Sequence, residues 1–467
     1  MAAVKKRPNI LFLFADDQRF DTIRELGNDT IVTPNMDKIV RDGVAFTHAF
    51  IQGGTTGAVC MPSRAMLHTG RPLFRIKDSG GSIPESHITM GEAFRKAGYR
   101  TFGTGKWHNG TQSYTRSFTD GAEIWFGGLL DHWNLPVNHF NPEGKYEKVP
   151  FCLNPRYSNE TRYMTCTHIN VGKHSSELLG ESAMEFLEKH KDTSPFFMYV
   201  AFLAPHDPRT MPQKYLDMYH PEKIPLPPNF TGRHPFDNGE LSVRDEMLAG
   251  FPRKPEEIKK HIAEYYAMIT HLDAQIGRII KTLGETGRLE NTIILLAGDN
   301  GLAVGQHGLM GKQNMYEHSV RVPLVMSGAG IPKNERRDSP VYLFDIFPTL
   351  AELADISTPK SVKGASFAPV IKNPRERTRR NLFFAYRHCQ RAVRDDRFKL
   401  IEYAVEGKRT TQLFDLQEDP FEMNNLAGDK KHKKVLSSFQ NLIVKAAEEW
   451  NDRDERWGKI FWKNFKT

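Results

Sequence analysis

The chain has few cysteines, and their spacing excludes two common uses of that residue. Its 467 residues contain four, Cys60, Cys152, Cys166 and Cys389, with none in the C-x-x-C spacing of a thiolate zinc site. Four is also too few for a disulfide scaffold. Cys152 and Cys166 are close enough in sequence to pair in an oxidising compartment, and two free thiols is the equal alternative.

Long apolar runs and long basic runs are also missing. No apolar stretch reaches the roughly 18 residues that a membrane-spanning helix needs, so no membrane span is expected. No basic arm, helix-turn-helix, zinc-finger or RNA-binding pattern occurs, so nucleic acid is not expected as a partner. The formal net charge of +8 instead suits an acidic substrate, a polyanion or a solvated surface.

The N-terminus carries no recognisable targeting segment. The basic stretch Met1–Arg7 leads directly into a strand-like run, and no cleavable apolar stretch precedes that run. We expect either a cytoplasmic protein or a periplasmic or secreted one whose signal peptide is absent from this sequence.

Short apolar runs rich in β-formers alternate with helix-like stretches. The predicted buried, parallel strands are Ile10–Phe14, Phe196–Phe202, Thr292–Leu296 and Val322–Met326, and the predicted helices are Ile88–Ala97, Ser175–His190 and Pro255–Thr286. This alternation predicts an α/β fold in which a large mixed, mostly parallel sheet is sandwiched by helices.

The character of the chain changes after a charged segment that contains Pro374, at residues 372–380. We therefore predict a catalytic α/β domain over residues 1–375 and a smaller α+β domain over residues 376–467. The second domain is expected to hold a small antiparallel sheet and a covering helix; its predicted strands are Arg394–Tyr403 and Gln412–Asp415, and its helix is Lys431–Asn451. Two insertions rich in Pro, Asn, His and aromatic residues, 109–170 and 207–254, are expected to wall the site.

Polar residues follow several of the predicted strands directly. They are Asp16 and Asp17, Lys106 and His108, His206, and Asp299 and Asn300. Because ligands bind at the carboxyl ends of strands in open α/β sheets, these side chains are candidates for one site. The two Asp-containing pairs offer only oxygen donors, which favours Ca²⁺, with Mg²⁺ as the less favoured hard cation. Taken alone, Asp16 and Asp17 also fit a helix cap and a solvated loop.

The run Cys60-Met61-Pro62-Ser63-Arg64, followed by Thr69-Gly70-Arg71, combines a helix start with a thiol and two guanidinium groups. Pro62 fits the first turn of a helix, which places Cys60 near the helix N-terminus, where free N–H groups favour an oxyanion. Arg64 lies one helical turn further on and can reach the same anion. The run therefore predicts a site for sulfate or phosphate; the alternative is that Cys60 is a small buried hydrophobe.

This run resembles the C-x-P-S-R and T-G-R motif of the formylglycine-dependent (type I) sulfatases, in the alkaline-phosphatase-like superfamily, and the chain as a whole resembles bacterial carbohydrate sulfatases. Further elements of the resemblance are Gly105-Lys106-Trp107-His108, the run from His307 to Lys312 with Tyr316-Glu317, and Leu413–Leu416 with Asp419-Pro420. The resemblance extends from Pro8 to Leu426.

The resemblance implies a chemistry and a set of roles. A formylglycine-generating enzyme would oxidise Cys60 to formylglycine (3-oxoalanine), whose hydrate attacks sulfur. The implied calcium ligands are Asp16, Asp17, Asp299, Asn300 and the modified residue at position 60. The implied catalytic residues are Cys60, Arg64, Lys106 and Lys312 around the sulfate, His206 as the acid for the leaving alcohol, and His108 as the base that reforms the aldehyde.

The expected substrate is a sulfated saccharide. The residues expected to bind it are His307, Tyr386, Arg387, His388 and Arg391. A purely structural role is the alternative for each of these residues. Two other functions stay open: a phosphonate monoester or phosphodiester hydrolase of the same superfamily, and a non-catalytic polyanion-binding protein if Cys60 is never oxidised.

Overall fold

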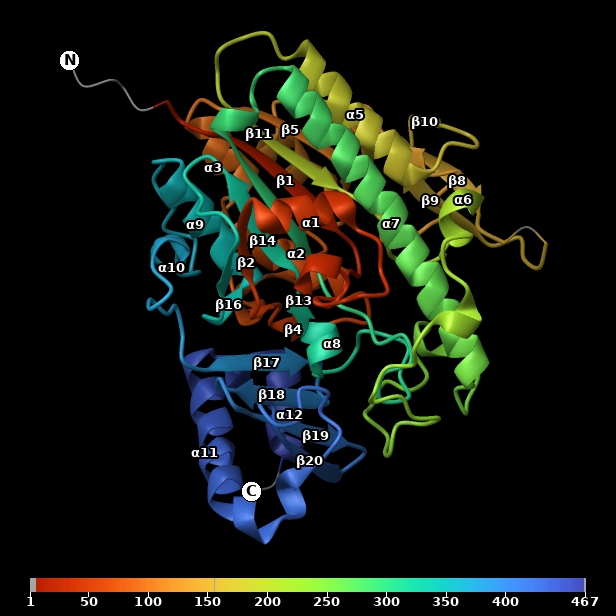
Figure 1. The fold of residues 1–467 in the computed structure, drawn as a ribbon, viewed down its shortest axis with the longest axis vertical. Helices are drawn as coiled ribbons and strands as arrows, with labels where there is room; N and C mark the ends of the chain where they lie inside the picture. The colour runs from red at the N-terminus through yellow and green to blue at the C-terminus, as the bar shows by residue number, and fades with distance from the viewer. Residues whose placement is uncertain (1–5, 155, 466–467) are drawn as a thin grey trace.

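The centre of the molecule is a large mixed sheet, shown in Figure 1. The computed structural model describes residues 6–154 and 156–465, so residues 1–5 of the basic N-terminal stretch lie outside the described part. In spatial order the strands of this sheet are β15 (Glu335–Arg337), β2 (Gly43–Phe46), β14 (Leu324–Gly328), β12 (Thr292–Gly298), β1 (Asn9–Ala15), β11 (Phe196–Ala201), β5 (Arg100–Lys106) and β6 (Asp120–Trp125).

Strand β1 lies in the middle of the sheet and is buried on both faces. Ile10, Phe12 and Phe14 pack in one apolar cluster, whereas Leu11 and Leu13 pack in the other. Helices α1 (Pro34–Arg41), α5 (Ser175–Lys189) and α7 (Pro255–Glu285) contribute to the Leu11 cluster, and α2 (Cys60–Thr69), α3 (Met90–Lys96) and α9 (Ile346–Leu353) contribute to the Ile10 cluster. Because helices cover both faces, the central strands are continuously apolar, and the predicted α/β sandwich is confirmed.

The prediction of one parallel strand over Val322–Met326 is wrong. Pro323 divides the run, since proline has no N–H to give to a strand ladder. Before it, β13 (Arg321–Val322) joins β3 (Ala49–Phe50) and β16 (Val341–Tyr342) in a separate three-stranded sheet. After it, β14 pairs with β12 in the antiparallel direction.

The insertion at residues 109–170 forms two small antiparallel pairs, β7 (Pro136–Val137) with β10 (His168–Ile169), and β8 (Lys148–Cys152) with β9 (Thr161–Thr165). Cys152 lies opposite Thr161, and Cys166 follows the far end of β9. Cys166 is five positions along the chain from Thr161, which spans about 17 Å in a strand, whereas a disulfide needs Cα atoms within about 7 Å. Both cysteines are free thiols in this structure.

The second sheet takes one strand from the first part of the chain. Its order is β20 (Lys408–Asp415), β19 (Phe398–Val405), β18 (Gln390–Arg394), β17 (Leu382–Tyr386) and β4 (Gly53–Gly54), with β4 parallel to β17. A Cβ on Gly53, which has φ +109°, would lie 2.0 Å from the carbonyl oxygen of Ala385, so only glycine allows this pairing. The segment before Cys60 is thereby joined to the C-terminal sheet.

Helix α11 (Lys433–Glu449) packs on this sheet as predicted, and α12 (Arg456–Asn464), which the sequence analysis did not predict, follows it. The remaining helices are short: α4 (Thr111–Ser117), α6 (Gln213–Leu216), α8 (Glu317–Val320) and α10 (Ala368–Lys372). Among the described residues, no helix is both long enough and apolar enough to cross a membrane.

Candidate active site

The ends of β1 and β12 bring the predicted acidic residues together. Ala15 pairs with Gly298 in the parallel register, so Asp16 and Asp299 leave the sheet side by side. The backbone N–H of Asp17 donates to Asp299 Oδ1 over 3.0 Å. Asn300 Nδ2 donates to Asp17 Oδ1 over 2.6 Å, and Asn300 is fully buried. The four residues thus form one oxygen-rich cluster, as the strand-end rule predicts.

Helix α2 begins at Cys60 and directs Arg64 under the acidic cluster. Arg64 is fully buried, and its Nε donates to Asp299 Oδ2 over 2.9 Å. Its Nη1 donates to the carbonyl oxygen of Lys106 over 2.8 Å, and its Nη2 lies 3.5 Å from Asp16 Oδ2. Protein groups therefore hold Nε and Nη1, whereas Nη2 has no hydrogen-bond partner within the described residues, and the predicted place of Arg64 beside the sulfate oxygens stays a prediction.

Lys106 and His108 reach the site from the end of β5. The Lys106 ammonium pairs with Asp16, and its Nζ is 3.4 Å from Cys60 Sγ. His108 Nδ1 is 3.5 Å from the same sulfur. A cation and an imidazole therefore both contact the sulfur atom of Cys60.

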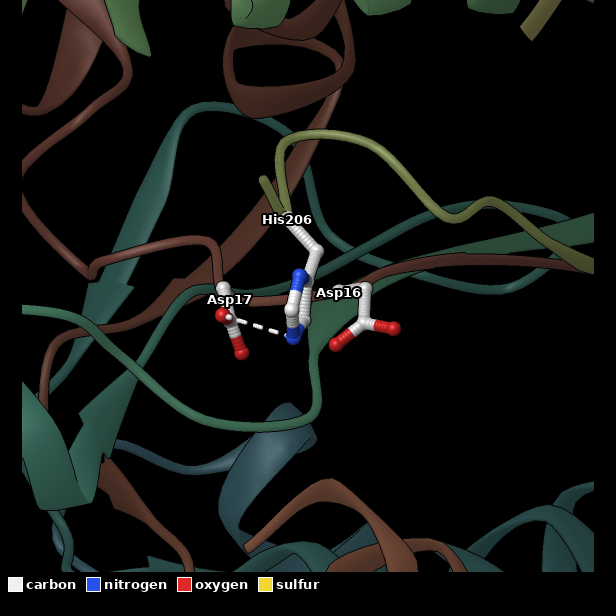
Figure 2. A group of neighbouring side chains, drawn as sticks. All are labelled: Asp16, Asp17 and His206. Atoms are coloured by element: carbon white, nitrogen blue, oxygen red, sulfur yellow. Dashed lines mark ion pairs between the residues drawn. The ribbon is translucent and has the colours of Figure 1, made fainter. Parts of the chain in front are cut away.

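Lys312 and His206 approach the cluster from the other side. Lys312 Nζ lies 2.6 and 2.8 Å from the two carboxylate oxygens of Asp17. His206 Nε2 lies 3.6 Å from Asp17 Oδ2, and Figure 2 shows this ring entering from a separate loop to face the adjacent Asp16 and Asp17. His206 Nδ1 donates to the carbonyl oxygen of Asp207 over 2.8 Å, so Nε2 is the ring nitrogen that faces the site.

Burial and charge set the protonation states here. Burial raises the pKa of the Cys60 thiol to about 11, so the thiol is protonated at neutral pH. Burial, reinforced by Asp16, raises the pKa of Asp299 to about 7. Burial alone would raise the pKa of Asp16 as well, but Lys106 and Arg64 outweigh it and hold that pKa well below its usual range. Burial, with the charge of Lys106, lowers the pKa of His108 well below its usual value, so this imidazole is neutral.

A cavity of about 340 Å³ opens onto this cluster. Of the predicted residues it is lined by Cys60, His108, His206 and Lys312. Both insertions contribute to its wall, through Gly128 and Leu129 and through Val243, Arg244 and Asp245, as predicted for those segments.

Sequence reasoning missed the polar part of this wall. Arg244 is about half exposed and pairs with Asp207 and Asp245, and Gln313 donates to Asp245 Oδ2 over 2.7 Å. Gln313 follows the predicted Lys312 directly, which is the only signal that pointed to it. Nothing local in the sequence marks Arg244 or Asp245, because each is a single charge within a polar loop.

The five predicted saccharide ligands lie elsewhere, and among the described residues none of them lines the 340 Å³ cavity. His307 is buried and stacks on Tyr316, with ring centroids 4.0 Å apart. Tyr386 and Arg391 are also buried, and Arg391 forms a two-bond ion pair with Asp452.

Arg387 and His388 lie in two neighbouring pockets. Arg387 pairs with Glu240 over 2.6 Å, and His388 stacks on Trp457 with ring centroids 5.6 Å apart. A role for these two residues in substrate binding stays a prediction.

Comparison with known proteins agrees with this geometry. The sulfatase family model matches residues 8–356, and the model of the C-terminal part of N-sulphoglucosamine sulphohydrolase matches residues 305–449. The chain is 28% identical to an arylsulfatase of Clostridium perfringens, covering 95% of each chain. It is 29% identical to an ulvan-active sulfatase of Formosa agariphila, covering 98% of this chain and 86% of that one.

The fold matches that of a protein solved in complex with its substrate D-glucosamine-2-N,6-O-disulfate. The TM-score is 0.76 at 23% identity, and the match covers 96% of this chain and 99% of the other.

Proposed function

The chain belongs to the sulfatase family and hydrolyses sulfuric esters, and on this premise we propose that it desulfates a sulfated saccharide through a formylglycine formed from Cys60, beside a bound Ca²⁺. The observation that carries the proposal is the cluster around position 60. There, Lys106 and His108 contact the sulfur atom of Cys60, and the acidic residues Asp16 and Asp299 lie beside it.

A saccharide substrate is supported by what similar proteins act on. One relative is named for activity on ulvan, and the protein with the matching fold was solved with a sulfated glucosamine as its substrate. The net charge of +8 suits an anionic substrate of this kind.

The acidic cluster fits a hard cation. Asp16 Oδ1 and Asn300 Oδ1 are buried, and neither has a hydrogen-bond partner within the described part of the chain. An unpaired buried oxygen is costly, and a cation would satisfy both. Asp16, Asp17, Asp299 and Asn300 would hold it together with residue 60, and an all-oxygen side-chain set favours Ca²⁺ over zinc. When bound, the cation offsets the charge of the sulfate group and polarises it.

The protonation state of Cys60 supports the need for modification. A buried thiol with a pKa of about 11 supplies almost no thiolate at neutral pH and is a poor nucleophile. Oxidation to formylglycine would give position 60 a hydrated aldehyde with two hydroxyl groups. His108 is a neutral imidazole whose Nδ1 lies 3.5 Å from the present Cys60 Sγ, so it is placed to deprotonate one of these hydroxyl groups.

Of the remaining side chains, the two lysines would bind the sulfate group and His206 would protonate the leaving group. Lys312 and Lys106 supply positive charge on two sides of position 60. His206 Nδ1 donates to the carbonyl oxygen of Asp207 and Nε2 faces the site, so the imidazolium form of the ring would deliver its Nε2 proton to the leaving alcohol and keep the hydrogen on Nδ1.

The test measures inorganic sulfate released from sulfated mono- and oligosaccharides and aryl sulfates, and the phenol released from aryl phosphonate monoesters and aryl phosphodiesters. The protein is co-expressed with a formylglycine-generating enzyme, residue 60 is examined by mass spectrometry, and Cys60→Ala protein is the matched control. Sulfate released from a saccharide supports the proposal. Turnover of phosphonate or phosphate esters alone favours the phosphonate hydrolase, and an active protein with an unmodified thiol refutes the formylglycine step.

A further inference from the structure

The loop that carries His206 is held by two buried histidines outside the cluster described above. His132 lies in the insertion between β6 and β7, and His174 immediately precedes α5. Both are almost fully buried, and their rings stack in parallel with centroids 5.1 Å apart. Neither lines the 340 Å³ cavity, and neither belongs to the sequence motifs discussed above.

Each of these rings holds one carbonyl of the His206 loop. His132 Nε2 lies 3.0 Å from the carbonyl oxygen of His206, and His174 Nε2 lies 2.8 Å from the carbonyl oxygen of Thr210. A carbonyl oxygen only accepts, so in both rings Nε2 carries the hydrogen. The two bonds fix the beginning and the end of the segment 206–210.

The opposite nitrogen of each ring is tied to the start of α5. Ser175 Oγ lies 2.7 Å from His132 Nδ1, and the backbone N–H of Ser176 donates to His174 Nδ1 over 3.1 Å. Burial lowers the pKa of His132 to about 4 and that of His174 to about 2, so both rings are neutral and each has a single N–H. With that N–H on Nε2, Nδ1 of His132 accepts from the Ser175 hydroxyl, so each ring joins the His206 loop to the start of α5.

We propose that His132 and His174 are positioning residues that hold the His206 loop against α5, so that His206 Nε2 meets the leaving oxygen of the substrate. The bond from His132 ends on the carbonyl of His206 itself, and the ring of His206 is further oriented by Asp207. Figure 2 shows why this matters, because His206 reaches Asp17 from a loop rather than from a strand end. A misplacement of about 1 Å at a catalytic group can cost 100-fold in rate.

The test rests on the proposed function and uses a matched pair of substitutions. In His132→Gln the amide nitrogen occupies nearly the position of Nε2 and still donates to the His206 carbonyl. In His132→Asn the shorter amide reaches only the position of Nδ1, and the bond to His206 is lost. The substrates are phenyl sulfate, a poor leaving group, and 4-nitrophenyl sulfate, a good one that needs little acid assistance.

We expect kcat of His132→Asn to fall about 10- to 100-fold with phenyl sulfate and at most about 3-fold with 4-nitrophenyl sulfate, with KM nearly unchanged. His132→Gln should stay within about 3-fold of the parent protein on both esters. If His132→Asn does not fold, Ser175→Ala, which removes only the hydroxyl that donates to His132 Nδ1, should show the same preference with a smaller loss.

Equal losses on the two esters, or a failure of glutamine to restore the phenyl sulfate rate, would overturn the positioning role while leaving the proposed function intact. A parent protein that carries formylglycine and releases sulfate neither from these two esters nor from any of the sulfated saccharides would instead refute the proposed function, and the positioning role with it.

Discussion

Replacing Arg64 by methionine should destabilise the fold, because this guanidinium is a buried counter-ion for the acidic cluster. Its Nε is 2.9 Å from Asp299 Oδ2, its Nη1 donates to the Lys106 carbonyl, and its side chain is fully buried. Methionine fills a similar volume but leaves Asp299 Oδ2 without its cationic partner.

The expected size follows from the burial. Removing one member of a buried ion pair costs about 3–5 kcal/mol, since the other charge stays buried and unpaired. The entropy of unfolding is about 2.1 cal/mol/K per residue, so for 467 residues that unfold together each kcal/mol lowers Tm by about 1 °C. We therefore expect Tm of Arg64→Met to fall by about 3–5 °C.

Differential scanning calorimetry measures this shift directly. Tyr199→Phe is the control, because it removes only one hydroxyl that lies 3.3 Å from Arg64 Nη1, which should cost at most about 1 kcal/mol. If Arg64→Met keeps its Tm within 1 °C of the parent and loses sulfate release, the reasoning fails, and Arg64 serves the substrate rather than the fold.

Three further outcomes are expected. Cys60→Ala should abolish sulfate release while Tm changes little, since the thiol makes only two long contacts, and residual turnover would contradict a nucleophile at position 60. Asp299→Asn should lower the bound calcium that plasma emission spectrometry detects, and an unchanged metal content would remove Asp299 from the ligand set. Burial raises the pKa of Asp273 from 3.8 to about 6, so this carboxyl binds its proton more tightly in the folded chain and stabilises it below pH 4. That stabilisation is lost as pH rises from about 4 to about 6, by roughly 3 kcal/mol. Asp273→Asn should remove this decline, and urea unfolding of both proteins at pH 4, 5, 6 and 7 checks it; parallel stability profiles would show that Asp273 does not titrate as inferred.

The sequence could predict strands and helices that local residue patterns specify, and the site residues that follow the carboxyl ends of parallel strands. The apolar run of β1 and the start of α2 are local, so the places of Asp16, Asp17 and Cys60 followed from periodicity and helix-start chemistry. Asp299 joined them because parallel neighbours end at the same edge of a sheet. The resemblance to sulfatases added roles to these residues and to Lys106 and Lys312, and those roles stay predictions.

The side chains that line the cavity were not predictable in this way. Arg387 and Arg391 were predicted from their residue type and from their place at the start of the second domain, but side chains alternate along a strand and only packing decides what each side contacts. Arg391 is turned inward onto Asp452, 61 residues later in the chain, where it forms an ion pair. Arg244 and Asp245, which carry no motif, line the cavity instead.

The tertiary structure alone decided the remaining relations. The antiparallel direction of β14, the pairing of β4 with β17 and the two histidines on the His206 loop all join segments far apart in sequence. Such contacts are selected by which surfaces can bury area and satisfy hydrogen bonds together, a property of the whole packed chain that no local stretch records. The sequence by itself determined the fold class, the chemical groups and their edge of the sheet; packing decided which of them line the cavity and which support the others.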